Sequence, residues 1–135
     1  QMFEELLHTN TNFLTIIRKL SYERGITLQQ SLILFHISSA GISMSNLADR
    51  LGLNASTITR NIEKLENKQL IYRQKCSTDS RKVNVFKSKI GDSIGNSIEL
   101  EANKYFISST NQTNTLKSLL QIMNWNLSIM NEKDD

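Results

Sequence analysis

Apolar residues recur along most of this chain at intervals of three and four positions, the spacing of one face of an α-helix. The clearest case is Ile58, Ile62 and Leu65, which fall on one side of a helix expected at residues 55–68. The same periodicity predicts five further helices, at residues 2–22, 28–38, 44–51, 89–109 and 116–130. The pattern therefore predicts a mainly helical protein.

Short polar residues and a glycine mark the ends of the central helices. Thr27, Ser43 and Asn54 are good N-cap residues for the helices that follow them. Gly52 can adopt the positive φ that ends a helix. Because so few residues separate the 44–51 helix from the 55–68 helix, the two must cross steeply, as in a helix-turn-helix.

Two short β-strands are expected after this helix pair. Leu70, Ile71 and Tyr72 begin the first strand, and Val83, Val85 and Phe86 form the second. The polar stretch between them, residues 77–82, is rich in residues that favour turns. A hairpin in this position is the wing of a winged helix, and its tip carries Arg81 and Lys82.

The predicted fold class is mainly α (α+β): a winged helix-turn-helix with a two-stranded wing, flanked by N- and C-terminal helices. We expect the winged helix at residues 27–90 and a helical dimerisation region at residues 1–26 and 91–135. The flanking helices are amphipathic and need a partner for their apolar faces. A second copy of the chain would supply one and make a homodimer, although closure within one chain is the alternative.

Length and composition narrow the class of protein. A chain of 135 residues with 39% hydrophobic residues fits one soluble domain with a helical extension. No apolar run reaches the roughly 18–20 residues that span a bilayer, and the N-terminus does not resemble a secretory signal. We therefore expect a cytoplasmic protein with no membrane partner.

The sequence contains no recognisable set of catalytic or metal-ligating residues. The single cysteine, Cys76, excludes an internal disulfide and a multi-cysteine zinc site, and His8 and His36 lack partners at metal-ligand spacing. There is no clustered His/Asp/Ser set and no glycine-rich phosphate loop. We expect no enzyme, no metal and no cofactor.

Positive charge is concentrated in the predicted winged helix. Residues 43–91 contain ten Lys and Arg against four Asp and Glu, a net charge of +6. Residues 1–42 are neutral, and residues 92–135 carry a net charge of −3. This distribution is typical of a nucleic-acid-binding module on a neutral scaffold, although a solvated charged face gives the same count.

The exposed face of the 55–68 helix carries hydroxyls and long cations, which suit the major groove of double-stranded DNA. Arginine there can bridge O6 and N7 of guanine. We predict DNA contacts by this helix, by the start of the helix before it and by the wing tip. The predicted residues are Ser43, Ser45, Ser56, Thr57, Thr59, Arg60, Lys64, Arg81 and Lys82.

The residues alone leave two alternatives open. Arg60 and Lys64 can instead pair with Glu63 and Glu66 on a solvated helix. A winged helix can also act as a protein-interaction or assembly module without sequence-specific DNA binding.

Three motifs resemble the MarR family of transcriptional regulators. The segment NLADRLGLNASTITRNIEKLENKQLIYR, residues 46–73, is similar to the family's scanning and recognition helices. STDSRKVNVF, residues 77–86, resembles its Asp-x-Arg wing signature at Asp79 and Arg81, and SKIG, residues 88–91, resembles its Thr-x-x-Gly motif. The chain departs from the family at Gln69 (usually glycine), at Lys87 (usually leucine) and at Lys82, where paired wing arginines are common.

The resemblance implies a homodimeric repressor that binds an inverted-repeat operator. The 55–68 helix would enter the major groove and the 76–83 wing the adjacent minor groove, with Arg81 as the matching wing residue and Asp79 orienting it. It also implies a small-molecule effector, for which Phe13, Ile17, Phe35 and His36 are pocket candidates, with plain core packing as the alternative. Cys76 is either a redox switch or an inert strand thiol.

Overall fold

A computed structural model describes residues 1–106 and 110–133 of the chain. Two compact units are present, Gln1–Ala102 and Asn103–Asp135. The first unit contains α1 (Met2–Glu23), α2 (Leu28–His36), β1 (Ile42–Ser43), α3 (Met44–Leu51), α4 (Ala55–Asn67), β2 (Ile71–Lys75), β3 (Val83–Lys87) and most of α5 (Lys89–Phe106). The second unit contains α6 (Thr110–Lys133).

The predicted fold class is confirmed: the chain is mainly helical with a small antiparallel sheet. The boundaries of α2 and α4 differ slightly, because α2 ends at His36 and α4 ends at Asn67. The expected start of the last helix at residue 116 was wrong, because α6 begins at Thr110 and continues through the polar residues before Leu116. The main addition is β1, which the sequence did not predict. The strand order is β1-β3-β2, with Ile42 opposite Val85.

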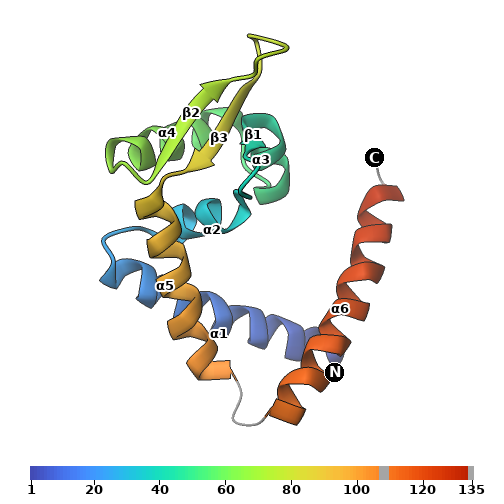
Figure 1. The fold of residues 1–135 in the computed structure, drawn as a ribbon. Helices are drawn as coiled ribbons and strands as arrows, with labels where there is room; N and C mark the ends of the chain where they lie inside the picture. The colour runs from blue at the N-terminus through green and yellow to red at the C-terminus, as the bar shows by residue number, and fades with distance from the viewer. Residues whose placement is uncertain (107–109, 134–135) are drawn as a thin grey trace. The chain divides into compact units, whose positions relative to one another are not determined.

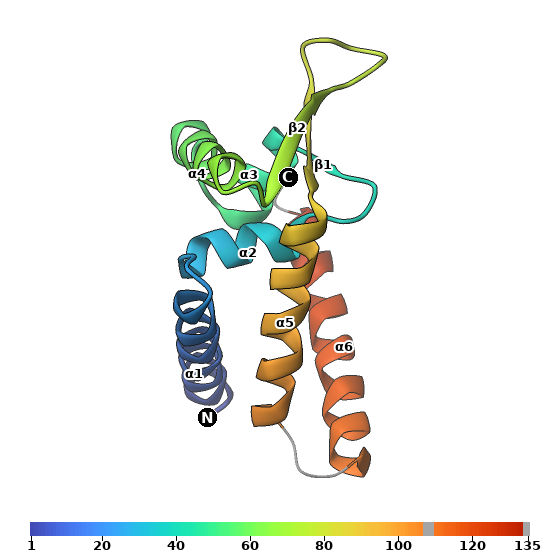
Figure 2. The ribbon, with the colours of Figure 1, turned by 60° about the vertical axis from the view of Figure 1, so that its left-hand side comes forward.

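One hydrophobic core holds the first unit together. Within α2, Ile33 and Leu34 are 0% and 1% exposed, as expected for a central helix. Figures 1 and 2 show α2 between α1 and the helix-turn-helix, with the hairpin of β2 and β3 projecting beyond α3 and α4. The core residues come from all the helices of this unit, from β2 and β3 and from the turns between elements: Ile17, Leu20, Ile26, Ile33, Leu34, Ile37, Leu47, Ala48, Ile58, Ile62, Leu65, Leu70, Ile71, Val85, Ile98 and Ala102.

The three predicted N-caps are all observed. Thr27 Oγ1 accepts the Gln30 backbone N–H at 3.1 Å, and Gln30 Oε1 accepts the Thr27 N–H at 3.1 Å. Ser43 Oγ accepts the N–H of Asn46 at 3.2 Å. These bonds fix where α2 and α3 begin, and the Asn54 cap of α4 is described with the site.

A left-handed residue ends α4. Gln69 has φ 61°, and it is the only residue other than glycine with positive φ in the described part of the chain. Its N–H donates to the Glu66 carbonyl at 2.8 Å, and the N–H of Leu70 donates to the Leu65 carbonyl at 3.0 Å. These two bonds form a Schellman motif, in which glycine usually occupies the left-handed position.

The start of α5 is locked against the end of the helix-turn-helix. Ser88 Oγ donates to the Gln69 carbonyl at 2.7 Å and accepts the Gly91 N–H at 3.1 Å. A Cβ at Gly91 would lie 2.0 Å from the Leu70 carbonyl oxygen. Only glycine therefore allows α5 to approach this closely, which accounts for the Ser-x-x-Gly motif.

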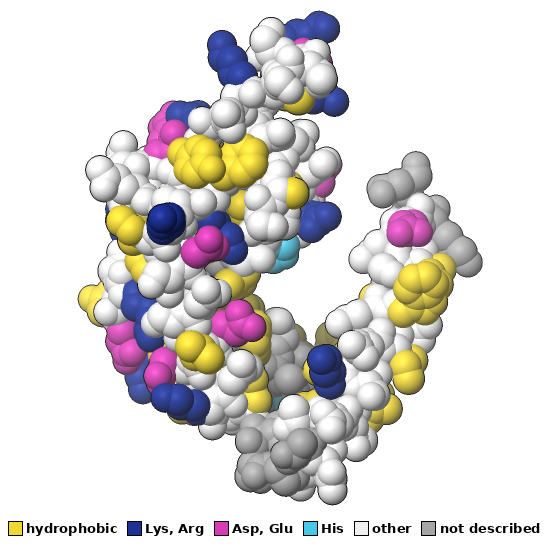
Figure 3. All heavy atoms as spheres, viewed as in Figure 1, with side chains coloured by type: hydrophobic (Ala, Val, Ile, Leu, Met, Phe, Trp, Pro, Cys, Tyr) yellow, Lys and Arg dark blue, Asp and Glu magenta, His cyan; other side chains and the backbone are white. Residues whose placement is uncertain are grey.

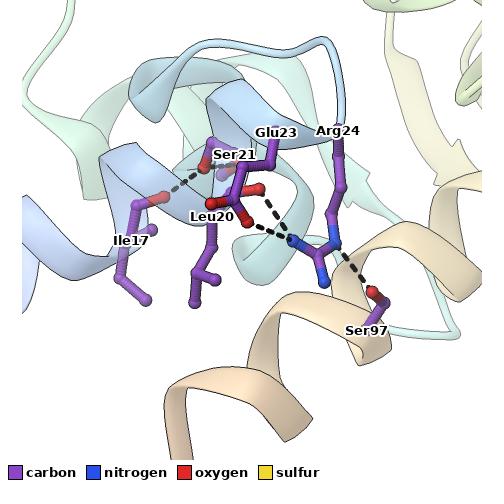
Figure 4. Close-up of polar contacts among 7 residues, drawn as sticks. Ile17, Leu20, Ser21, Glu23, Arg24 and Ser97 are labelled. Carbon is purple, nitrogen blue, oxygen red and sulfur yellow. Dashed lines mark hydrogen bonds and ion pairs between the residues drawn. The ribbon is translucent and has the colours of Figure 1, made fainter. Parts of the chain in front are cut away.

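Arg24 joins the end of α1 to α5 within the first unit (Figure 4). Its Nε donates to Ser97 Oγ at 2.7 Å, and its Nη1 donates to the Leu20 carbonyl at 2.9 Å. Lys68, at the end of α4, donates from Nζ to the Gly25 carbonyl at 2.6 Å. The turn after α1 thus connects α5 to the end of the helix-turn-helix.

Candidate nucleic-acid interface

Helix α4 buries one face and exposes the other, as its sequence predicts. Ile58, Ile62 and Leu65 are 2%, 0% and 0% exposed. The opposite face presents Arg60 and Lys64 to solvent. An anchored helix with an exposed cationic face is the geometry required for insertion into a groove.

The N-terminus of α4 is organised by Asn54. Its Oδ1 accepts the backbone N–H of Thr57 and the hydroxyl of Ser56, both at 2.8 Å. Ser56 is exposed, while Thr57 and Thr59 are half-buried. Because the Ser56 hydroxyl already donates to Asn54, it presents its lone pairs outward, as an acceptor.

The acidic neighbours of Arg60 and Lys64 do not neutralise them. Glu66 instead pairs with Arg73 on β2, with 2.7 Å between Oε1 and Nε. Within the described part of the chain, neither Arg60 nor Lys64 forms an ion pair. The solvated-helix alternative, in which these cations pair with Glu63 and Glu66, is therefore not what the structure shows.

The wing loop is closed by its own hydrogen bonds. The Cys76 N–H donates to the Lys82 carbonyl at 2.9 Å, and the Lys82 N–H donates to the Asp79 carbonyl at 3.0 Å. Asp79 Oδ1 accepts the Arg81 N–H at 3.0 Å and lies 3.5 Å from Arg81 Nε. Asp79 thus holds the turn, while the Arg81 side chain remains 92% exposed.

Cations gather at the end of this wing. Figure 3 shows Lys and Arg side chains around the projecting tip at the top of the view. Arg81 and Lys82 are both exposed there. Their positive charge lies beyond the body of the first unit, where it can contact an adjacent groove of a duplex.

A groove of about 370 Å³ lies between α3, α4 and the wing. Five of the predicted residues line it: Ser43, Ser45, Thr59, Arg81 and Lys82. The other four, Ser56, Thr57, Arg60 and Lys64, lie on α4 outside this lining. The fold therefore brings together residues almost 40 positions apart in sequence, and their hydroxyls and cations share this groove with apolar side chains of α3, α4 and the wing.

A second groove, of about 580 Å³, contains residues that the sequence analysis missed. It lies between the end of α2, β1, α3 and the base of the wing, and its lining includes Asn46 and Arg50. These two residues lie four apart, on one face of α3. That spacing was a usable signal, but the groove depends on elements distant in sequence.

The four residues predicted for an effector pocket lie in different surroundings. Ile17 belongs to the core and is 2% exposed, whereas Phe13 and Phe35 are 39% and 38% exposed. His36 lines the second groove, and its Nδ1 lies 2.7 Å from the Leu32 carbonyl, to which it donates. The pocket stays a prediction.

The thiol of Cys76 has a pKa below its usual value. Thr78 Oγ1 lies 3.2 Å from its Sγ, and hydrogen bonding from Thr78 is the first cause that holds the pKa of Cys76 below its usual value. Backbone hydrogen bonding and the charge of Lys82 act in the same direction. The thiol is therefore more readily ionised than an ordinary cysteine.

The described residues contain no group of three or more potential metal-ligating His, Cys, Asp or Glu side chains. None of the described helices combines the length and apolarity needed to cross a membrane.

The sequence and fold were compared with known proteins. The model of the MarR family matches residues 24–82. A comparison with curated proteins returned no match.

Solved structures similar to this chain include several MarR regulators. A MarR transcriptional regulator from Methanosarcina mazei Go1 superposes with TM-score 0.74 and 21% identity, covering 95% of this chain and 97% of that one. The Staphylococcus aureus MepR–DNA complex gives TM-score 0.70 and 19% identity, with coverage of 93% and 98%. CouR from Rhodococcus jostii RHA1, bound to p-coumaroyl-CoA, gives TM-score 0.72 and 18% identity, with coverage of 91% and 91%.

These findings agree with the motifs read from the sequence. The family match covers the helix-turn-helix and the wing loop, and the structural likeness extends over the flanking helices. Residues 24–82 therefore match the model of the MarR family, and the chain has the fold of the MarR transcriptional regulators among these solved structures.

Proposed function

We propose that this chain is a homodimeric transcriptional repressor that binds double-stranded DNA sequence-specifically at an inverted-repeat operator. In this proposal the 55–68 segment, which contains α4, enters the major groove. The 76–83 wing contacts the adjacent minor groove. One observation carries the proposal above the others. The groove between α3, α4 and the wing gathers hydroxyls and cations from three elements beside an α4 face whose cations are not neutralised.

Each group in this surface has a distinct task. Arg60 reads a base edge in the major groove, where a bidentate contact to guanine contributes about 1–3 kcal/mol of discrimination. Ser43 Oγ accepts the Asn46 N–H and lies 3.3 Å from Ser45 Oγ, so the two hydroxyls together can donate to a phosphate. Arg81 extends into the narrow minor groove, where negative potential favours arginine. Asp79 keeps the Arg81 backbone in place.

Exposed apolar side chains support the dimer. On α1, Met2, Phe3 and Leu7 are 71%, 73% and 55% exposed. On α6, Leu119 and Trp125 are 59% and 67% exposed. Large apolar side chains clustered on amphipathic helices mark protein interfaces, and a two-fold dimer places two recognition helices in successive major grooves.

Binding to a selected duplex tests the proposal. With a duplex recovered by selection from random-sequence DNA, Arg60→Ala should weaken binding about 10-fold or more, while binding to a scrambled duplex changes little. Arg18→Ala, which removes an exposed cation from α1, is the matched control and should bind like the wild type. Equal affinity of the wild-type protein for selected and scrambled duplexes would support a protein-interaction module instead.

Repression and ligand release complete the proposal. CouR shares the fold and was solved with p-coumaroyl-CoA bound, so a small effector that lowers DNA affinity is a reasonable partner here. Phe13, Ile17, Phe35 and His36 are its candidate contacts. Loss of the protein should raise transcription from the promoter that contains the selected sequence, and a fall in transcription would indicate an activator.

A further inference from the structure

The second groove has the chemistry of an anion site. Arg50 projects from α3 and Lys82 from the wing, and both line this groove of about 580 Å³. Asn46 and Asn84 add side-chain amides that can donate hydrogen bonds. The lining residues described include no Asp or Glu.

The two cations of this groove are not neutralised elsewhere. In the described part of the molecule, neither Arg50 nor Lys82 forms an ion pair. Cations that face a polar concavity without a carboxylate create a local positive potential. An arginine with donors arranged in a fork matches phosphate particularly well.

The groove is continuous with the surface already assigned to DNA. Ser43, Ser45 and Lys82 line both grooves, so these three residues form the ridge between them. A nucleic-acid strand that contacts the ridge from the first groove reaches the second groove at its next positions. A backbone phosphate therefore fits the site better than an isolated small anion does.

We propose that the second groove binds a phosphodiester of the DNA backbone, held by Arg50 and Asn46 of α3 together with Lys82 of the wing. This inference rests on the proposed DNA-binding function. It adds a sequence-independent contact that fixes the register of the wing relative to α3 on the duplex.

The salt dependence of duplex binding tests the inference. Each phosphate neutralised contributes about −0.9 to the slope of log K against log salt concentration. Arg50→Ala should make that slope shallower by about 0.9 and should leave the preference for the selected over the scrambled duplex unchanged. Arg50→Lys, which retains the charge, should restore most of the slope, and Arg18→Ala is the control for loss of a distant cation.

Several outcomes separate failure of this inference from failure of the proposed function. If Arg50→Ala keeps the wild-type slope while Arg60→Ala still loses specific binding, the groove does not hold a phosphate and the proposed function stands. If the wild-type protein binds no duplex, the proposed function itself fails, and the DNA contact fails with it. Circular dichroism melting should show that Arg50→Ala folds, since the side chain is exposed.

Nuclear magnetic resonance of the wild-type protein gives a second, mutation-free test. The side-chain amide of Asn46 should shift when the selected duplex is added, and inorganic phosphate at the same phosphate concentration should shift it far less. A shift with inorganic phosphate but none with the duplex would identify a small-anion site and overturn the DNA assignment. No shift with bound duplex would overturn it as well.

Discussion

Replacing Gln69 by glycine should make this protein more stable. The residue has φ 61°, a left-handed conformation that costs a residue with a Cβ roughly 1–2 kcal/mol. The conformation is imposed by three hydrogen bonds: Gln69 N–H to Glu66, Leu70 N–H to Leu65, and Ser88 Oγ to the Gln69 carbonyl. All three use backbone atoms of residue 69 or 70, so the substitution preserves them.

The expected gain follows from two opposing terms. Glycine relieves the roughly 1–2 kcal/mol of left-handed strain, but it adds about 0.4–1 kcal/mol of backbone entropy to the unfolded chain. The Gln69 side chain is exposed, so little packing is lost. The net expectation is a rise of about 0.5–1 kcal/mol in the free energy of unfolding, or a few degrees in Tm.

Urea denaturation of the wild type and two variants measures this effect. Gln69→Gly should raise the midpoint without changing the slope. Gln74→Gly, at an exposed position of β2 whose φ is not positive, is the matched control and should lower the free energy of unfolding by about 0.5–1 kcal/mol. A fall in stability for Gln69→Gly would refute the argument that strain at this position outweighs chain entropy.

Three further changes have definite expected outcomes. Gly91→Ala should destabilise the fold by about 1–3 kcal/mol in urea denaturation, because the new Cβ would lie 2.0 Å from the Leu70 carbonyl oxygen; unchanged stability would mean that α5 does not pack this closely. Asn54→Ala should lower the free energy of unfolding by about 1 kcal/mol, because the α4 cap is lost. Asn54→Ser should keep most of the wild-type stability, because serine can also cap a helix. Thr78→Val should raise the pKa of the Cys76 thiol toward its usual value and slow its alkylation by iodoacetamide at pH 7, and an unchanged rate would contradict the role of the Thr78 hydroxyl.

The sequence predicts the helices and their caps well because those signals are local. Thr27, Ser43 and Asn54 each act within three residues of their own position, so composition and spacing suffice. By contrast, β1 comprises only Ile42 and Ser43, too short to show alternation. It exists because β3 provides a pairing edge far along the chain, which no local pattern reveals.

The surface chemistry depends on long-range contacts in the same way. The sequence places Glu66 near the cations of its own helix, yet it pairs with Arg73 across the turn into β2. The predicted residues on α3 and the wing meet in one groove, and the second groove around Arg50 needs α2, β1, α3 and the wing together. The sequence shows that Gln69 departs from the family pattern. Only the backbone geometry shows that this residue has the strained left-handed conformation.

Selection from a random-sequence duplex library tests the central claim most directly. The wild-type protein should enrich an inverted repeat with half-site centres about 10–10.5 base pairs, or one helical turn, apart. Arg60→Ala should relax one position in each half-site while Arg18→Ala enriches the wild-type motif. Enrichment of no motif by the wild-type protein would contradict the claim that α4 and the wing read DNA sequence.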